Sequence, residues 1–176
     1  MRSYLQIGLS LVVAIALAAA IFFYRTKTDG PVSGSDRLQQ ATAAEILEHV
    51  KALNSPLVLV NFWASWCEPC KVEFPHLLTI REKYAERGLK VVFVSLDGLD
   101  DAQAALRFLD SMGVDFSTFY KGDQTLKFVN EIYPKWSGAI PMTLLFGTGL
   151  SLVDAWEGDA SLQEFEERVE RHLKGT

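Results

Sequence analysis

Two cysteines, Cys67 and Cys70, with two residues between them, occur in the stretch Asn61-Phe-Trp-Ala-Ser-Trp-Cys-Glu-Pro-Cys. An apolar run precedes this stretch and a helical pattern follows it, so the pair is predicted to lie where a strand passes into a helix. The first turn of a helix offers unpaired backbone N–H groups and the positive end of the helix dipole, and both favour a thiolate. We therefore predict that Cys67 is the nucleophile. Cys70 lies one turn further in, where it can close a disulfide.

Other uses of a cysteine pair are less consistent with the sequence. A structural disulfide across so short a loop stabilises little. A structural zinc site needs about four ligands, and the chain has neither a second cysteine pair nor a His-x-x-x-His motif. His49, His76 and His172 are scattered, and no Pro-x-x-x-Thr-x-x-Cys motif of a peroxidase is present. The main alternative to dithiol–disulfide exchange is a metallochaperone that binds Cu(I) between the two thiolates, which are soft ligands.

Length and composition indicate one ordinary domain with an extension. The chain has 176 residues, of which 49% are hydrophobic, and this is enough for a hydrophobic core that is stable without structural disulfides. The formal net charge is −5, and the lysines and arginines are dispersed. This charge pattern argues against nucleic acid as a partner. We expect no cofactor and no resident metal.

The N-terminal segment is long and apolar enough to span a bilayer as one helix, since no formal charge occurs from Ser3 to Tyr24. Ala18-Ala-Ala20 resembles the cleavage site of a signal peptide, but the apolar run continues beyond it. No cysteine lies near the segment, which excludes a lipoprotein anchor. The predicted division is a transmembrane signal anchor at 1–24, a flexible linker at 25–36 and a folded domain at 37–176.

Apolar runs and helical patterns alternate along that domain. Leu57 to Trp63 is too apolar to alternate and predicts a central strand that is covered on both faces. The helix that opens at the cysteines is predicted to reach about Arg87, with Gly88 as its stop. A final hairpin and a helix capped by Ser161 complete the pattern. The expected fold is α/β, with a central mixed β-sheet flanked by helices on both faces. Further strands are predicted at 90–95, within 114–120, at 142–146 and at 150–156, and further helices at 42–53, 101–112 and 124–132.

The order of these features resembles the thioredoxin superfamily: a strand, Trp-Cys-x-x-Cys, a helix with a proline, then Ile-Pro before a late strand. Within it, the stretch from Asn61 to Pro75 is similar to the membrane-anchored thiol–disulfide oxidoreductases of the TlpA/ResA type. The additional segment between Asp97 and Lys121 matches the insertion that separates this group from thioredoxin itself. The resemblance implies a thioredoxin-like fold.

The resemblance also implies roles for individual residues. Cys67 becomes the attacking cysteine and Cys70 the resolving one. Pro141 matches the family's cis-proline, which packs beside the disulfide and presents backbone to a bound peptide, so the Ile140–Pro141 bond is expected to be cis. The residues expected to meet a substrate are Trp66, Glu68, Pro69, Ile140 and Pro141.

An acidic residue follows the second cysteine by one turn in this branch of the family, and Glu73 occupies that position here. A carboxylate near the thiols would disfavour the thiolate and could accept or return its proton during exchange. The alternative for Glu73 is an ordinary exposed position on the helix. Glu68 adds a second negative charge beside Cys67. We therefore predict that Cys67 is less acidic than in a strong oxidant, which makes the pair a better reductant.

Two departures from the family pattern concern the surroundings of the cysteines. The family opens with a β-hairpin before its first helix, and residues 36–56 show no such pattern. The segment Tyr133 to Ile140 is longer than the common form, and Met142 follows the proline where Thr or Ser is typical. Trp136, within that segment, either lines the docking groove or packs in the interior.

The resemblance implies a membrane-tethered protein-disulfide reductase. Its catalytic domain is expected on the outer face of a bacterial inner or plasma membrane, the periplasmic or extracytoplasmic side, where disulfides persist. The expected partners are disulfide-containing substrate proteins and a membrane electron donor of the DsbD/CcdA type. Substrates in this family include the haem-site cysteines of apocytochrome c and the cysteines of copper-site proteins.

Overall fold

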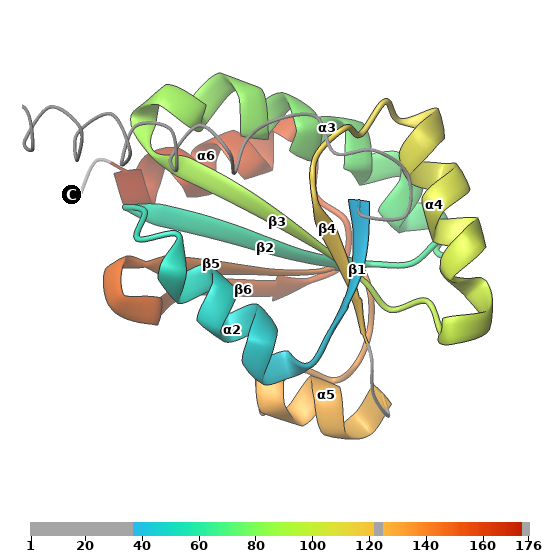
Figure 1. The fold of residues 1–176 in the computed structure, drawn as a ribbon. Coiled ribbons are helices and arrows are strands. Elements are labelled where there is room, and N and C mark those ends of the chain that lie inside the picture. Colours follow the sequence, from blue (N-terminus) through green and yellow to red (C-terminus); the bar gives the residue numbers. More distant parts are fainter. Residues whose placement is uncertain (1–36, 122–124, 174–176) are drawn as a thin grey trace, which may run out of the picture.

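One six-stranded sheet forms the centre of the domain (Figure 1). The structure, a computed structural model, describes residues 37–121 and 125–173. The strand order is β1-β4-β3-β2-β5-β6, in which β1 to β4 are mutually parallel and β5 runs antiparallel to both β2 and β6. The sheet is therefore mixed, as predicted. Its strands are β1 (Leu38–Ala41), β2 (Leu57–Trp63), β3 (Leu89–Ser95), β4 (Thr118–Lys121), β5 (Met142–Gly147) and β6 (Ser151–Glu157).

Helices cover both faces of this sheet. α3, α4 and α6 lie on one face, and α2 and α5 lie on the other (Figure 1). The three-layer arrangement confirms the predicted fold class, because each apolar face of the sheet is buried against helices. The helices are α2 (Ala43–Ala52), α3 (Glu68–Tyr84), α4 (Ala102–Ser111), α5 (Thr125–Ile132) and α6 (Leu162–Leu173).

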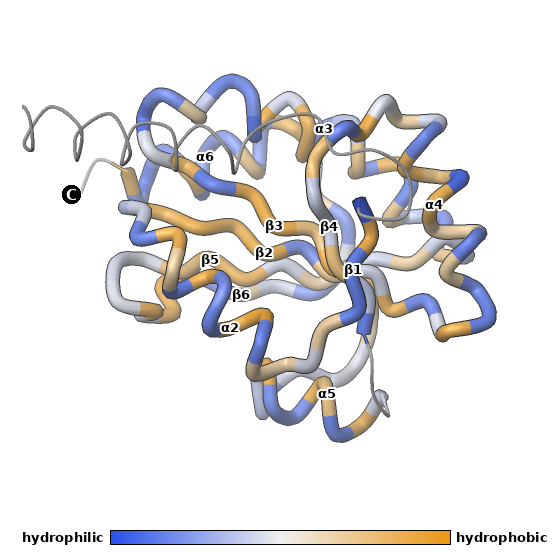
Figure 2. Tube along the Cα trace, viewed as in Figure 1, coloured by the Kyte–Doolittle hydropathy of each residue, from blue (hydrophilic) through white to orange (hydrophobic). Residues whose placement is uncertain are grey.

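The strand β2 explains why the predicted apolar run does not alternate. All seven of its residues are buried. Successive side chains point to opposite faces of a strand. Phe62 accordingly packs on Phe128 of α5, while Trp63 packs on Phe74 of α3 and on Phe108 of α4. The apolar colouring of β2 and of its neighbours β3 and β5 marks the same central core in Figure 2.

Most predicted elements are present, and one strand was missed. The cysteine-bearing helix ends close to the predicted position: α3 passes into a short 3-10 helix (Ala85–Arg87), and Gly88 follows with a left-handed φ of 87°. The strand β1 was not predicted. It is a short edge strand whose two glutamines, Gln39 and Gln40, are exposed, so it has no apolar run to reveal it. It pairs in parallel with β4 and forms no hairpin.

The predicted anchor at 1–24 and the predicted linker at 25–36 lie outside the described residues. Within 37–121 and 125–173, none of the helices combines the length and the apolar character needed to cross a membrane.

Candidate active site

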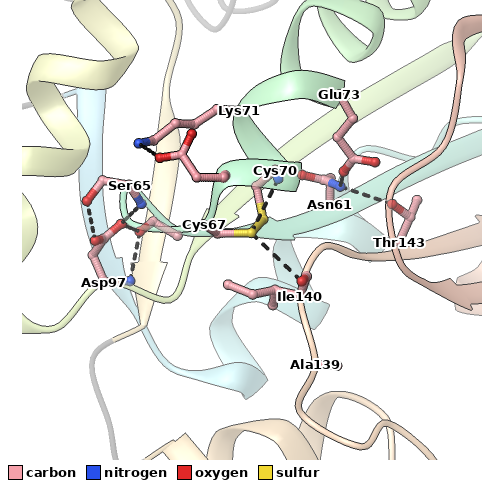
Figure 3. Close-up of a disulfide and its surroundings, with 12 residues drawn as sticks. Asn61, Ser65, Cys67, Cys70, Lys71, Glu73, Asp97, Ala139, Ile140 and Thr143 are labelled. Atoms are coloured by element: carbon pink, nitrogen blue, oxygen red, sulfur yellow. Dashed lines mark hydrogen bonds and ion pairs between the residues drawn. A yellow bond between two sulfur atoms is a disulfide. The ribbon is translucent and has the colours of Figure 1, made fainter.

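Cys67 and Cys70 form a disulfide at the start of α3, with their Cα atoms 5.3 Å apart (Figure 3). Cys67 is the N-cap of the helix, and the backbone N–H of Cys70 points at its Sγ atom over 3.3 Å. In the reduced protein the same N–H would stabilise a thiolate on Cys67. The exposed fraction is 5% for Cys67 and 1% for Cys70, so Cys67 is the sulfur that a substrate reaches more easily.

The connection from β2 to α3 is short and tightly bonded. The N–H of Cys67 donates to the carbonyl oxygen of Ala64 over 3.1 Å, which turns the chain into the helix. Pro69 lies in the first turn of α3. Proline is tolerated there because the N–H groups of a first turn have no partner within the helix. The end of a buried strand and the start of a helix together fix the positions of both sulfurs.

The loop before β5 lies against the disulfide. The Ile140–Pro141 bond is cis, as expected, and the carbonyl oxygen of Ile140 lies 3.8 Å from Cys67 Sγ. Two hydrogen bonds hold this loop: Trp136 Nε1 donates to the Ala139 carbonyl over 2.7 Å, and the Gly158 N–H donates to the Pro141 carbonyl over 2.8 Å. The structure thus brings together the two motifs that the sequence separates by about 70 residues.

Of the two alternatives for Trp136, interior packing is the one observed. Its side chain is buried, with its ring centroid 4.8 Å from that of Phe62. Trp66, in contrast, is 62% exposed beside Cys67. Pro69 is also exposed, Ile140 is half-buried and Pro141 is buried. The surface around the sulfurs is therefore formed by Trp66, Pro69 and the backbone of the cis-proline loop.

The predicted contribution of Glu68 needs a correction. Its carboxylate is exposed, and Lys71 Nζ lies 2.7 Å from Glu68 Oε1. The prediction counted the negative charge of Glu68 without this positively charged neighbour. The two residues are three positions apart on a helix, a spacing that brings side chains together, so this ion pair could have been predicted from the sequence. We therefore attribute less of the electrostatic effect on Cys67 to Glu68.

Glu73 is the acidic residue with the most unusual surroundings. Its exposed fraction is 1%, so the alternative of an ordinary exposed position is wrong. Asn61 Nδ2 donates to its Oε1 atom over 2.8 Å (Figure 3), and the backbone N–H of Ala160 donates to Oε2 over 3.1 Å. Burial raises the pKa of Glu73 to about 7, although these two hydrogen bonds oppose the rise; the charge of Asp159 adds to it. The group can therefore take up or release a proton near neutral pH.

Asn61 extends the polar contacts of Glu73 into the sheet. It lies in β2 directly opposite Thr143 of β5, and its Nδ2 atom also donates to Thr143 Oγ1 over 3.0 Å. Both side chains are fully or almost fully buried. The carboxylate of Glu73, the amide of Asn61 and the hydroxyl of Thr143 form one polar chain through an apolar core.

Asp97, which the sequence reasoning did not single out, is a second buried carboxylic side chain near the cysteines. It accepts hydrogen bonds from the Ser65 N–H (2.9 Å), the Ser65 hydroxyl (2.6 Å) and the Ser95 hydroxyl (2.5 Å). Ser65 precedes Cys67 by two residues, so Asp97 ties the end of β3 to the cysteine loop. The carboxyl ends of parallel strands meet at one edge of a sheet, and Asp97 follows a predicted strand. That position could have identified it.

No group of three or more His, Cys, Asp or Glu side chains is placed to hold a metal ion in the part of the chain that the structure describes.

The raised pKa of Glu73 predicts a specific pH dependence of stability. Because the folded protein binds this proton more tightly than the unfolded chain, the stabilisation is complete below pH 4.5 and is lost as the pH rises through about 7. Glu73→Gln removes this titration. The free energy of unfolding of the oxidised variant, relative to that of the unaltered protein, should therefore be higher at pH 8 than at pH 5, by on the order of 2 kcal/mol. Urea unfolding at both pH values measures this difference. Glu82→Gln, at an exposed position of α3, is the control, and an equal response of the two variants would contradict the assignment.

Asp97→Ala should destabilise the domain, because it leaves the N–H and the hydroxyl of the half-buried Ser65 and the hydroxyl of the buried Ser95 without their acceptor. The expected loss in the free energy of unfolding is roughly 2–4 kcal/mol. Asp100→Ala, at an exposed position three residues on, should change it by less than about 0.5 kcal/mol. Urea unfolding of the oxidised variants measures both changes. Equal effects at the two positions would rule out an anchoring function of Asp97.

Comparison with known proteins assigns the chain to a family. Residues 39–152 match the AhpC/TSA family. A thiol-disulfide oxidoreductase ResA from Oceanobacillus iheyensis is 29% identical over 109 residues, which cover 62% of this chain and 53% of the relative. The ResA protein of Bacillus subtilis is 26% identical over 153 residues, which cover 82% of this chain and 78% of the relative.

Solved structures show the same fold. A thiol:disulfide interchange protein from Chlorobium tepidum superposes with a TM-score of 0.59 at 20% identity, covering 69% of this chain and 83% of that structure. StoA from Bacillus subtilis superposes with a TM-score of 0.53 at 20% identity, covering 66% and 84%. With its thioredoxin-like fold, its Cys-x-x-Cys disulfide and relatives named thiol-disulfide oxidoreductases, the chain belongs to the AhpC/TSA family.

Proposed function

We propose that the protein is a thiol–disulfide oxidoreductase that reduces disulfides of substrate proteins. The observation that carries this proposal is the Cys67–Cys70 disulfide at the first turn of α3, with Cys67 Sγ 3.8 Å from the Ile140 carbonyl of the cis-proline loop. The first sulfur is the more exposed, and the second lies behind it. A nucleophile at a helix start, with a second thiol within reach, can both attack a disulfide and release the product.

The reaction is a two-electron exchange in two steps. The Cys67 thiolate attacks one sulfur of the substrate disulfide, that S–S bond breaks, and the other substrate sulfur leaves as a thiolate that takes up a proton. Cys70 loses its proton and attacks Cys67 Sγ in the mixed disulfide. The bond between Cys67 and the substrate breaks, so the substrate departs as a dithiol and the protein becomes the disulfide seen here.

Glu73 is proposed to exchange a proton with the thiols during these steps. It follows Cys70 by three residues on the same helix, and both side chains are buried. A pKa of about 7 lets the carboxylate accept a thiol proton and return it near neutral pH. In its ionised form the same group opposes the ionisation of the thiols, which makes the reduced pair less favoured and the protein more reducing.

The proposed substrate surface consists of the five residues predicted to meet a substrate. The exposed ring of Trp66 offers an apolar contact beside Cys67. The cis-proline loop presents its backbone at Ile140 next to the reactive sulfur. Glu68 and Pro69 border the disulfide from the first turn of α3, and Pro141 shapes the loop from within.

We further propose that the domain works outside the cytoplasm, tethered by the N-terminal segment. Disulfides persist outside the cytoplasm, where a domain that exchanges them finds its substrates. A protein that leaves each reaction as a disulfide needs a source of electrons. A membrane donor of the DsbD/CcdA type would supply them, and apocytochrome c or copper-site cysteines would be substrates.

The two cysteines should behave differently when one of them is removed. Cys70→Ser retains the attacking sulfur but cannot resolve the mixed disulfide, so it should accumulate a covalent adduct with an oxidised substrate protein. Cys67→Ser should capture little or nothing, since Cys70 is only 1% exposed. Non-reducing electrophoresis after acid quenching, with reduction as the control, measures the adduct. Equal trapping by both variants would contradict the assigned roles.

A further inference from the structure

The amide of Asn61 is placed to respond to the charge of Glu73. Its Nδ2 atom donates both to Glu73 Oε1 and to Thr143 Oγ1, whereas its Oδ1 atom is buried and has no partner (Figure 3). Buried side-chain oxygens are rarely left without a donor. Three elements meet at this point: β2 supplies the amide, β5 the hydroxyl and α3 the carboxyl group.

The observed arrangement suits the ionised form of Glu73. A carboxylate only accepts hydrogen bonds, and here it accepts one from Asn61 at Oε1 and one from Ala160 at Oε2. Once Oε1 carries a proton, its O–H would face the N–H of Asn61, donor against donor. Since the N–H of Ala160 already faces Oε2, we place the proton on Oε1, where it needs an acceptor in the position at which Asn61 now presents its amino group.

A half-turn of the Asn61 amide provides that acceptor. It exchanges the positions of Oδ1 and Nδ2, which have nearly the same size, so the surrounding side chains need not move. Oδ1 can then accept from the Glu73 O–H and from the Thr143 hydroxyl, because a hydroxyl group can donate as well as accept. The Ala160 N–H still donates to Oε2 of the neutral acid. Each orientation leaves one end of the amide without a partner, so this penalty is similar in both.

We propose that Asn61 is a positioning residue whose amide reverses when Glu73 changes its protonation state, with Thr143 as the hydroxyl that serves both orientations. This inference deepens the proposed function, since it gives the proposed proton-exchange group a partner for each charge state. Asn61 and Thr143 let the buried carboxyl group change its charge without two hydrogen-bond donors facing each other.

Two further charged or titratable side chains and the two cysteines lie near Glu73. Asp159 lies next to Ala160 and raises the pKa of Glu73 by its negative charge. On α3 itself, His76 Nδ1 lies 3.3 Å from the carbonyl oxygen of Ala160, and the two cysteine sulfurs lie at the start of the same helix. In the oxidised protein the sulfurs do not titrate. A change seen in that state therefore does not come from the sulfurs, and the variant Glu73→Gln identifies the part of it that depends on Glu73.

The test uses nuclear magnetic resonance on the oxidised full chain in detergent micelles, from pH 5 to pH 9. We expect a nuclear Overhauser contact between the Asn61 side-chain NH₂ and the Thr143 methyl group at high pH. It should weaken several-fold at low pH, with the same midpoint as the carbon-13 signal of the Glu73 carboxyl. Glu73→Gln assigns that signal and should abolish the pH dependence of the contact. A contact of equal strength at both ends of the titration would overturn the proposal.

Two variants add an independent reading. Asn61→Leu removes the donor to the ionised carboxylate, so the proton affinity of Glu73 should rise about tenfold. Thr143→Ser removes the methyl group that reports the contact but retains the hydroxyl, so it should leave the midpoint of the Glu73 carboxyl signal in place. An unchanged Glu73 midpoint in Asn61→Leu would contradict the inference. The disulfide-exchange rate of Glu73→Gln is measured separately. If that rate is normal while the contact follows the titration, the amide reversal stands and the proposed catalytic role of Glu73 fails.

Discussion

The burial of β2 on both faces is the constraint on which the site depends. A strand between two helical layers has no access to water, so any polar side chain in it must find a partner inside the protein. Asn61 is the one polar residue of the strand, and it points to the same face as Trp63, toward α3. Glu73 supplies the partner from that helix. The polar chain beside the cysteines is therefore built into the core packing and does not depend on a surface loop.

Two electrostatic effects act in opposite directions on the reactive sulfur. The start of α3 favours a thiolate on Cys67, since the N–H of Cys70 already points at its sulfur. The buried carboxyl group of Glu73 disfavours a nearby thiolate once it is ionised. The exposed Glu68 adds less, because Lys71 neutralises it. The proposed reducing function depends on the balance between the start of a helix, which favours the thiolate, and a buried acid, which opposes it.

Local patterns in the sequence predicted the cysteine pair at the start of a helix, and the resemblance to the thioredoxin superfamily predicted the cis bond before Pro141 and singled out Glu73. They did not predict what surrounds these groups. That Thr143 lies opposite Asn61 depends on the register of two strands far apart in the chain, and the bond between Asp97 and Ser65 depends on how two parallel strands end. Such contacts leave no periodicity in the sequence. The strand β1 was not predicted for a related reason, since an edge strand with exposed glutamines lacks an apolar pattern.

The reduction potential of the Cys67–Cys70 pair, measured in the full chain by equilibration with thiol buffers at pH 7, tests the central claim most directly. A buried acid that opposes the thiolate predicts a value close to that of thioredoxin, about −270 mV. The same acid predicts a less negative value for Glu73→Gln. A potential close to that of DsbA, about −120 mV, would make the protein an oxidant and contradict the account.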